Sequence, residues 1–234
     1  MTIVFKELRK FHNYIKKVVL EQYATIPKTR LLDLACGKGG DIPKWLHNNN
    51  ITFVKGYDIN SQSIQEAKRR LAQLNRIKRK KIYFYVENLS TRIIDCREFP
   101  YDIITSNFAL HYFFKNESTL KSILQTIQNC SKQGTFLILT LFDGSRIKKS
   151  IKTDEFNIKL CSDKEIEVSL KDSVLHQPEI EYLVTPQDLI AALEKISFVP
   201  REIIPFNAFK KFETLSENEQ LFSGLNNLYV FERV

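Results

Sequence analysis

The feature that most constrains this fold is an alternation of short apolar runs with amphipathic segments through most of the chain. Each apolar run has the length of one buried strand, and each segment between them has apolar residues at helical spacing. The predicted strands lie at 30–35, 51–59, 81–88, 101–108 and 134–142, and the predicted helices at 5–24, 41–48, 61–74 and 116–131. Such alternation is typical of a parallel sheet that helices cover on both faces. We therefore expect a doubly wound α/β fold.

The region from about 145 to 185 interrupts this rhythm. Two extended segments, a helix, an apolar run and a terminal strand follow in that order, at 166–171, 179–185, 185–196, 198–206 and 226–234. The two extended segments lie around a polar stretch, as in an insertion that carries its own strands. We interpret residues 1–234 as one domain with an insertion at about 145–185 on the substrate side of the sheet.

The composition argues against several classes of protein. No run approaches the ~18 uninterrupted apolar residues of a membrane span, and the N-terminus lacks the apolar region of a signal peptide. The four cysteines stand far apart, without a CxxC pair or clustered histidines. This spacing argues against a zinc site or a disulfide framework and favours a reducing compartment. The net charge of +8 and the isoelectric point near 9.2 are compatible with a polyanionic partner.

The first predicted strand leads into a glycine-rich turn, with the sequence LLDLACGKGGD at 31–41. A P-loop is excluded, because position 32 is leucine and a glycine, not serine or threonine, follows Lys38. A dinucleotide fingerprint is half present, with Asp58 as the acid that binds ribose hydroxyls. The turn also fits the loop that binds S-adenosylmethionine, in which an acid on the first strand, here Asp33, precedes the glycines. The turn alone does not separate these two cofactors, nor either from a turn that needs glycine for its own geometry.

Residues elsewhere in the chain favour one of these interpretations. Five segments resemble, in order, the mRNA cap guanine-N7 methyltransferase family: KFHNYIKKVVL, LLDLACGKGGDIPKW, GYDINSQSI, NFALHYFF and EIEYLV. The resemblance runs through nearly the whole chain. It implies a Rossmann-like class I S-adenosylmethionine-dependent methyltransferase with a mostly parallel seven-stranded sheet. The isoleucine-, lysine- and asparagine-rich composition is also similar to that of large cytoplasmic DNA viruses. The chain resembles the methyltransferase domain of a longer multifunctional capping enzyme, like that of African swine fever virus.

The resemblance implies a set of contacts to S-adenosylmethionine and to its product, S-adenosylhomocysteine. Lys17 matches the lysine that reaches the carboxylate of the cofactor, and Asp58 matches the acid that binds its ribose. The other residues implied at the cofactor are Ala35, Gly37, Asp41, Asn88, Asn107 and Tyr112. The family implies no metal ion.

The family also implies an adjoining pocket for the guanine of the cap. Glu181 matches the glutamate that accepts hydrogen bonds from guanine N1 and N2. His111 matches a histidine in contact with the base, and Tyr112 lies between the two ligands. Asn13, one helical turn before Lys17, matches an asparagine beside the cap. The remaining residues implied at the cap are Phe108, along the pocket, and three cations near the triphosphate bridge, Lys38, Lys44 and Arg70.

Several positions depart from the family pattern. Ala35 replaces the first glycine of the turn, and Asn88 replaces an aspartate near the adenine amino group. Asn107 is one methylene shorter than the glutamine of the family, and Ser90 stands where an aromatic residue is frequent. These departures affect the expected affinities more than the expected reaction, and they leave room for a partner subunit.

The resemblance implies methyl transfer from S-adenosylmethionine to N7 of the guanine in GpppN-capped RNA. Because N7 has a free lone pair and a sulfonium is a good leaving group, we expect catalysis by proximity and orientation, with no catalytic general base. The implied partners are capped RNA, triphosphatase and guanylyltransferase domains in the same polypeptide, and a stimulatory subunit. The implied setting is the cytoplasm, such as a virus factory, or a virion, without a membrane. Two alternatives stay open: a methyltransferase for another substrate, and a degenerate methyltransferase fold that acts as an RNA-binding or regulatory subunit.

Overall fold

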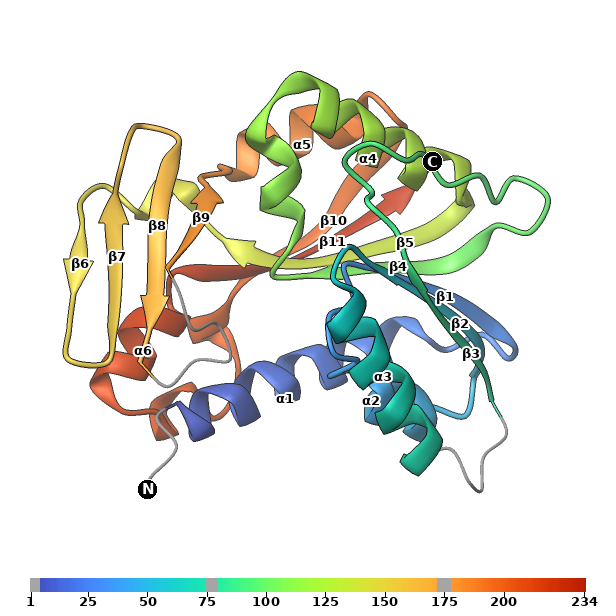
Figure 1. The fold of residues 1–234 in the computed structure, drawn as a ribbon, viewed down its shortest axis with the longest axis horizontal. Coiled ribbons are helices and arrows are strands. Elements are labelled where there is room, and N and C mark those ends of the chain that lie inside the picture. The colour runs from blue at the N-terminus through green and yellow to red at the C-terminus, as the bar shows by residue number, and fades with distance from the viewer. Residues whose placement is uncertain (1–4, 75–79, 172–177) are drawn as a thin grey trace.

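The chain forms two β-sheets flanked by helices (Figure 1). The computed structural model describes residues 5–74, 80–171 and 178–234. The larger sheet has seven strands in the order β10-β11-β5-β4-β1-β2-β3. These are β1 (Thr29–Leu34), β2 (Ile51–Asp58), β3 (Lys81–Val86), β4 (Tyr101–Asn107), β5 (Ser131–Phe142), β10 (Phe198–Pro205) and β11 (Asn226–Arg233). Strands β1 to β5 are parallel to one another, and β11 is antiparallel to both of its neighbours. The predicted doubly wound, mostly parallel seven-stranded sheet is confirmed.

Helices cover both faces of this sheet, as Figure 1 shows. On one face lie α1 (Lys6–Tyr23), α2 (Ile42–His47) and α3 (Ser61–Leu74), and on the other α4 (Glu117–Asn129) and α5 (Pro186–Glu194). Successive side chains of a strand point to opposite faces, so Leu31 and Leu32 of β1 belong to different hydrophobic clusters, one on each face. Both leucines are fully buried. Within the described part of the chain, no helix is long and apolar enough to cross a membrane.

The second sheet lies between β5 and α5, inside the insertion predicted at about 145–185. Its strands are antiparallel and run in the order β6 (Ile151–Lys152), β7 (Phe156–Leu160), β8 (Glu165–Leu170) and β9 (Glu179–Tyr182). One face, with Ile166 and Val168, joins the same hydrophobic cluster as α1. The ends of the insertion meet where the Gly144 N–H donates to the Val184 carbonyl at 2.9 Å. A Cβ at Gly144 would lie 2.9 Å from the Val184 backbone, so this close approach requires glycine.

A short helix near the C-terminus, α6 (Glu217–Ser223), fastens the start of α1, and the sequence analysis did not predict it. Phe5 precedes α1 in a left-handed conformation (φ 62°) and supplies no side-chain cap. Instead, Glu219 Oε1 accepts a hydrogen bond from the Leu8 N–H at 2.9 Å. This N–H belongs to the first turn, where helical N–H groups have no partner in their own helix. The ring of Phe222 packs against Phe5 at 6.0 Å, so α6 and α1 form one unit.

Candidate functional site

The glycine-rich turn follows β1 at the carboxyl edge of the sheet. Ala35, Gly37 and Gly39 have left-handed backbones, with φ of 60°, 52° and 69°. A Cβ on Gly39 would lie 2.6 Å from the side chain of Ile42, so packing also requires glycine there. A Cβ on Gly37 would meet open space, which leaves room for a ligand beside the backbone. Ala35 adopts the same conformation with a side chain, which costs roughly 1–2 kcal/mol.

Asp58 ends β2 beside this turn. Its Oδ2 accepts a hydrogen bond from the Gly37 N–H at 2.7 Å, and its Oδ1 accepts one from the Asn60 N–H at 2.9 Å. Asn88 lies just beyond β3, where its side-chain oxygen accepts from the Ser90 N–H at 3.0 Å. The structure therefore joins Asp58 directly to the glycine turn, while Asn88 closes a turn of its own after the neighbouring strand.

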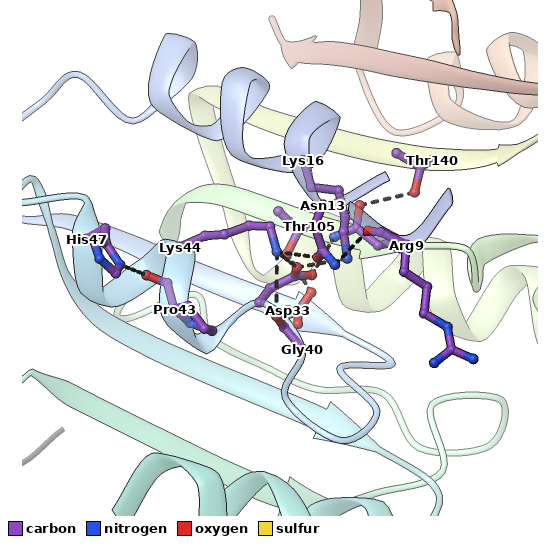
Figure 2. Close-up of polar contacts among 12 residues, drawn as sticks. Arg9, Asn13, Lys16, Asp33, Gly40, Pro43, Lys44, His47, Thr105 and Thr140 are labelled. Carbon is purple, nitrogen blue, oxygen red and sulfur yellow. Dashed lines mark hydrogen bonds and ion pairs between the residues drawn. The ribbon is translucent and has the colours of Figure 1, made fainter. Parts of the chain in front are cut away.

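A buried ionic cluster lies between the glycine turn and α1 (Figure 2). Asp41 Oδ1 is 2.8 Å from Lys16 Nζ and 2.6 Å from Lys44 Nζ. The Asn107 amide donates to Asp41 Oδ2 at 3.2 Å, and the Thr140 hydroxyl donates to Asn107 Oδ1 at 3.2 Å. Burial raises the pKa of Asp41, but the two ammonium groups outweigh burial and hold this pKa at about 2. Burial also lowers the pKa of Lys44. The cluster joins α1, the glycine turn with α2, β4 and β5.

Asp33 borders this cluster on β1. Its Oδ1 accepts a hydrogen bond from the Thr105 hydroxyl at 2.6 Å, and its side chain is buried. Burial, followed by the negative charge of Asp41, raises the pKa of Asp33 to about 7. Near neutral pH, Asp33 is therefore protonated in a large fraction of the molecules, whereas Asp41 is ionised.

The structure corrects the assignment made to Lys17. Lys17 is exposed and lies 3.7 Å from Glu21 on the outer side of α1, whereas Lys16 reaches Asp41. The reason is helical phase: Ile15 packs into the core, and one further residue turns the side chain by ~100° away from it. The lysine that α1 directs toward Asp41 and the glycine turn is thus Lys16, one position earlier than the predicted Lys17.

Asn13 requires the same shift of one residue. Asn13 is exposed, and its Oδ1 accepts a hydrogen bond from Lys44 at 2.6 Å, so it belongs to the rim of the ionic cluster. His12 takes the position expected for Asn13, where it lines a cavity and its Nε2 lies 3.0 Å from the Ser223 hydroxyl. His12 and Lys16 are also four residues apart, and they, rather than Asn13 and Lys17, point to the inner side of α1. The apolar phase of α1 was the signal that could have found His12.

The three predicted phosphate-binding cations differ in exposure. Lys38 is exposed on the glycine turn. Lys44 is buried in the ionic cluster, with its side chain 9% exposed. Arg70 is bound to Glu66 on α3 at 2.7 Å. The sequence pattern could not distinguish a free cation from one committed to a neighbouring carboxylate.

The cavity that His12 lines has a volume of about 230 Å³ and lies beyond the carboxyl ends of β4 and β5. Its wall comes from α1, β8, β9, α6 and a 3₁₀ helix, Leu110–Lys115. Phe108 stands at its entrance from β4 with a left-handed backbone (φ 55°), and its ring stacks on His12 at 5.1 Å. Asn107 belongs to the ionic cluster and Phe108 to this cavity, so the two regions adjoin along consecutive residues.

His111 and Glu181 face each other in this cavity. His111 Nε2 lies 3.3 Å from Glu181 Oε2, without the geometry of a hydrogen bond. Neither ring nitrogen of the buried His111 has a hydrogen-bond partner in the part of the chain that the structure describes. Tyr112 donates its hydroxyl proton to Glu179 at 2.7 Å, which leaves Glu181 open to the cavity. Of the two glutamates, the predicted Glu181 thus lines the cavity, and Glu179 is bound to Tyr112.

Burial sets the charge state of this pair. It lowers the pKa of His111 to about 3, so the imidazole is neutral at neutral pH. Burial, followed by the negative charge of Glu179, raises the pKa of Glu181 to about 8. Buried polar groups normally have hydrogen-bond partners, and leaving one without costs about 1–3 kcal/mol. A ligand with polar edges would supply the missing partners.

Comparisons with known proteins agree with this geometry. A family model described as the mRNA (guanine-N(7))-methyltransferase domain matches residues 2–220. The mRNA cap guanine-N(7) methyltransferase 1 of Arabidopsis thaliana is 29% identical over an alignment 245 positions long. This alignment covers 96% of this chain and 62% of that protein. The enzyme of Schizosaccharomyces pombe is 26% identical over 87% of this chain and 57% of its own length. The chain thus spans less than two thirds of the length of these relatives.

Superposition on solved structures shows the fold of this chain. A putative S-adenosylmethionine-dependent methyltransferase from Listeria monocytogenes superposes with a TM-score of 0.67 at 15% identity, over 98% of this chain and 100% of that one. One from Clostridium acetobutylicum gives 0.64 at 14% identity, over 95% and 90%. The fold is that of the class I S-adenosylmethionine-dependent methyltransferases, with an added antiparallel sheet. Through the family match over most of its length, the chain belongs to the mRNA (guanine-N(7))-methyltransferase domain family.

Proposed function

We propose that this protein transfers a methyl group from S-adenosylmethionine to N7 of the guanine in a GpppN cap on RNA. The observation that carries the proposal is the pair formed by His111 and Glu181, two largely buried polar side chains that face a cavity. The ring nitrogens of His111 have no hydrogen-bond partner among the residues described. This cavity adjoins the glycine turn through Asn107 and Phe108, which is the arrangement that a transfer between two bound ligands requires.

Guanine matches the chemistry of this cavity. Its N1 and N2 hydrogens are donors that favour ionisation of Glu181, whose pKa burial raises to about 8 in the free protein, and a neutral imidazole at His111 offers one donor and one acceptor. The rings of Phe108 and Tyr112 provide the apolar surface against which a purine packs. Together these four side chains distinguish a polar purine edge from an apolar ligand.

The glycine turn fits S-adenosylmethionine. The backbone beside Gly37 borders open space, and Asp58 stands next to it as an acceptor for ribose hydroxyls. In the ionic cluster, Lys16 and Lys44 carry two positive charges against the one negative charge of Asp41. The surplus favours a ligand carboxylate near Lys16, which we propose in place of Lys17. When bound, this cofactor supplies a methyl group activated by a sulfonium.

The residues of the chain would act by positioning. Guanine N7 has no proton to lose, so the reaction needs no general base. Holding the base through Glu181 and His111, in line with the methyl group, can lower the barrier by up to ~7–11 kcal/mol. The low pKa of His111 keeps the imidazole neutral, which avoids repulsion of the positive charge that guanine gains.

The exposed cation on the glycine turn extends the proposal to the phosphates. Lys38 is the member of the predicted set that is exposed on the turn, so we propose that it contacts the triphosphate bridge. Lys44 and Arg70 are held by Asp41 and Glu66, and we propose that they act by positioning these neighbours. Binding through phosphates should weaken as the salt concentration rises.

We also propose a cellular context from the sequence resemblance. The chain would act as the methyltransferase unit of a viral capping enzyme in the host cytoplasm, with triphosphatase and guanylyltransferase domains and a stimulatory subunit as partners. All four cysteines are free in the structure, which is in keeping with a reducing compartment.

Transfer of a labelled methyl group from S-adenosylmethionine tests the proposed function. We expect label on GpppA-RNA, and nuclease digestion should place it on N7 of the cap guanine. Uncapped RNA and free metabolites are the controls. Label on a metabolite but not on capped RNA would refute the proposed substrate, and absence of cofactor binding in calorimetry would refute the enzyme itself.

A substitution at Asp58 tests the cofactor side. Asp58→Ala removes the acceptor beside Gly37, so we expect affinity for S-adenosylhomocysteine to fall about tenfold or more, as for a lost hydrogen bond to a charged group. Affinity for a cap analogue should change little. Asp163→Ala, at an exposed aspartate of the insertion, is the control. Unchanged cofactor affinity in Asp58→Ala would contradict the assignment.

A further inference from the structure

One half of the large sheet carries exposed aromatic and basic side chains on the face away from α3. Residues paired in register share a face, and the pairs here are Phe53 with Lys81, Lys55 with Tyr83, and Tyr57 with Tyr85. Tyr83 and Tyr85 are 44% and 42% exposed. In Figure 1, α4 and α5 lie over the other half of the sheet, and no helix of the described chain covers this half. We refer to the surface of these six residues as the β2–β3 face.

A cavity of about 690 Å³ adjoins this face, at the segment that leads into β4. The guanidinium carbon of Arg30 lies 4.3 Å from the centre of the Phe53 ring and 5.3 Å from that of Tyr101. Arg30 also donates to the carbonyl of Phe99, at 3.2 Å, so its planar group is held among aromatic rings. The Phe99 ring itself is 66% exposed. The cavity therefore presents flat π surfaces that are fixed in place.

The charges around this surface are mainly positive. Arg30, Lys55 and Arg97 line the cavity together with two carboxylates, Asp95 and Glu98. Asp95 is neutralised by an ion pair with Arg97. Lys81, at the start of β3, adds a further exposed cation next to Phe53. Exposed aromatic rings interleaved with cations are the features that bind single strands of nucleic acid, because every base has a face that can stack.

We propose that the β2–β3 face and the adjoining cavity bind single-stranded RNA on the 3′ side of the cap. Bases would stack on Tyr83, Tyr85 and Phe99, and phosphates would lie near Lys55 and Lys81. The positive charge favours RNA over a protein partner, for which an exposed apolar surface would suffice. The proposal rests on the proposed function, since it names a further contact of the same substrate.

Distance makes this contact separable from the cap pocket. Strands β1 and β2 lie between β4 and β3, so β3 is about 14 Å from β4 across the sheet. The cavity lies at the amino end of β4, beside Tyr101, whereas Phe108 follows the carboxyl end of that strand, about 20 Å further along it. A cap dinucleotide held at Glu181 would not reach that far, whereas RNA of several nucleotides would. Length of RNA thus distinguishes the two sites.

The double variant Tyr83→Ala/Tyr85→Ala tests the proposal. We expect its affinity for a 20-nucleotide uncapped single strand, and its KM for the capped form, to worsen about tenfold or more. Its KM for the GpppA dinucleotide should equal that of the wild type. The matched control, Ile26→Ala/Ile203→Ala, removes exposed apolar side chains elsewhere and should leave all three constants unchanged. Wild-type RNA affinity in a folded tyrosine variant would overturn the proposal.

Cys96 provides a second, independent readout in the unaltered protein. Cys96 lines the cavity and is partly exposed, so an alkylating reagent can reach its thiol. Uncapped RNA should slow alkylation of Cys96 by iodoacetamide several-fold, while the exposed Cys161 of the insertion reacts at an unchanged rate. GpppA alone should give no protection of Cys96.

The outcomes separate the two proposals. Protection of Cys96 by the dinucleotide would place the cap itself, rather than the following nucleotides, in this cavity. No protection of Cys96 by RNA would show that RNA does not occupy it. A surface reserved for a protein partner would give the second result. Methyl transfer to GpppA does not involve the β2–β3 face, so its failure would count against the proposed function and leave protection by uncapped RNA intact.

Discussion

Two neighbouring polar regions of this protein differ in how completely their hydrogen-bonding groups are used. Around Asp41, two ammonium groups and an amide converge on one buried carboxylate. At the other region, His111 and Glu181 lie close together, and the imidazole has no hydrogen-bond partner among the described residues. Asn107 and Phe108 connect the two. The comparison teaches that buried polar groups are arranged in two ways here: around Asp41 they join elements of the fold, and at His111 they leave ring nitrogens without partners among the described residues.

The largest expected effect breaks the first region. Asp41→Ala leaves Lys16 and Lys44 buried without a counter-charge, which should lower the free energy of unfolding by about 3–5 kcal/mol. Urea denaturation measures this change. Asp163→Ala, on the surface, should stay within ~0.5 kcal/mol of the wild type. A loss below ~1 kcal/mol in Asp41→Ala would mean that the cluster contributes little to stability.

The next effect is on activity and concerns the second region. Glu181→Ala should lower methylation of capped RNA more than tenfold, because the ligand donors lose their carboxyl acceptor, while S-adenosylmethionine binding stays nearly intact. Glu167→Ala is the matched control: Glu167 pairs with Ile180 on β9 and faces away from the cavity side of the insertion sheet. Equal loss of cap methylation and cofactor binding would argue against a role at the cap.

A pH dependence sharpens the contrast. Glu181 has a pKa of about 8 in the folded protein against an ordinary value near 4.5. A raised carboxyl pKa gives a contribution to stability that is complete below the ordinary pKa and is lost as pH rises through about 8. Glu181→Gln, which stays neutral, should therefore gain a few degrees in Tm relative to the wild type between pH ~4 and pH ~9. Scanning calorimetry measures the Tm of both proteins across this pH range, with Glu167→Gln as the control. A Tm difference between Glu181→Gln and the wild type that does not change with pH would contradict a buried carboxyl.

The smallest effect concerns the turn beside both regions. Ala35 has a left-handed backbone, so Ala35→Gly should stabilise the fold by roughly 0.5 kcal/mol, the relief of strain exceeding the added freedom of the unfolded chain. Thermal denaturation measures the change. Gly37→Ala, which places a side chain at the same kind of backbone, should destabilise by a comparable or larger amount. A less stable Ala35→Gly variant would contradict this account of the turn.

Sequence patterns predicted the sheet because its buried strands are short apolar runs, whereas the helices that cover it have apolar residues at helical spacing. The predicted Glu181 lines the cavity, and its contact with guanine stays a prediction. The patterns failed by one residue for Lys17 and Asn13, since helical phase is fixed by what packs beneath the helix. They also missed that Lys44 is buried, because its partner Asp41 becomes a partner only through the fold.

Helix α6 was missed for a related reason. Its seven residues, Glu217–Ser223, are mostly polar, and its buried Phe222 packs against Phe5, just before α1, and Phe156 of the insertion. The left-handed backbone of Phe108 likewise had no local signal, since phenylalanine has no preference for it. Both features depend on tertiary packing, which no short pattern contains.

The bond between Glu219 and Leu8 has a consequence for biosynthesis. It joins two residues 211 positions apart, so a ribosome releases α1 long before it makes the group that closes the first turn of that helix. Because His12 on α1 and Phe222 on α6 both line the cavity, the nascent polypeptide cannot enclose its ligand until translation has passed α6. The wall of this cavity is therefore complete only after α6 has been synthesised, more than 200 residues after α1.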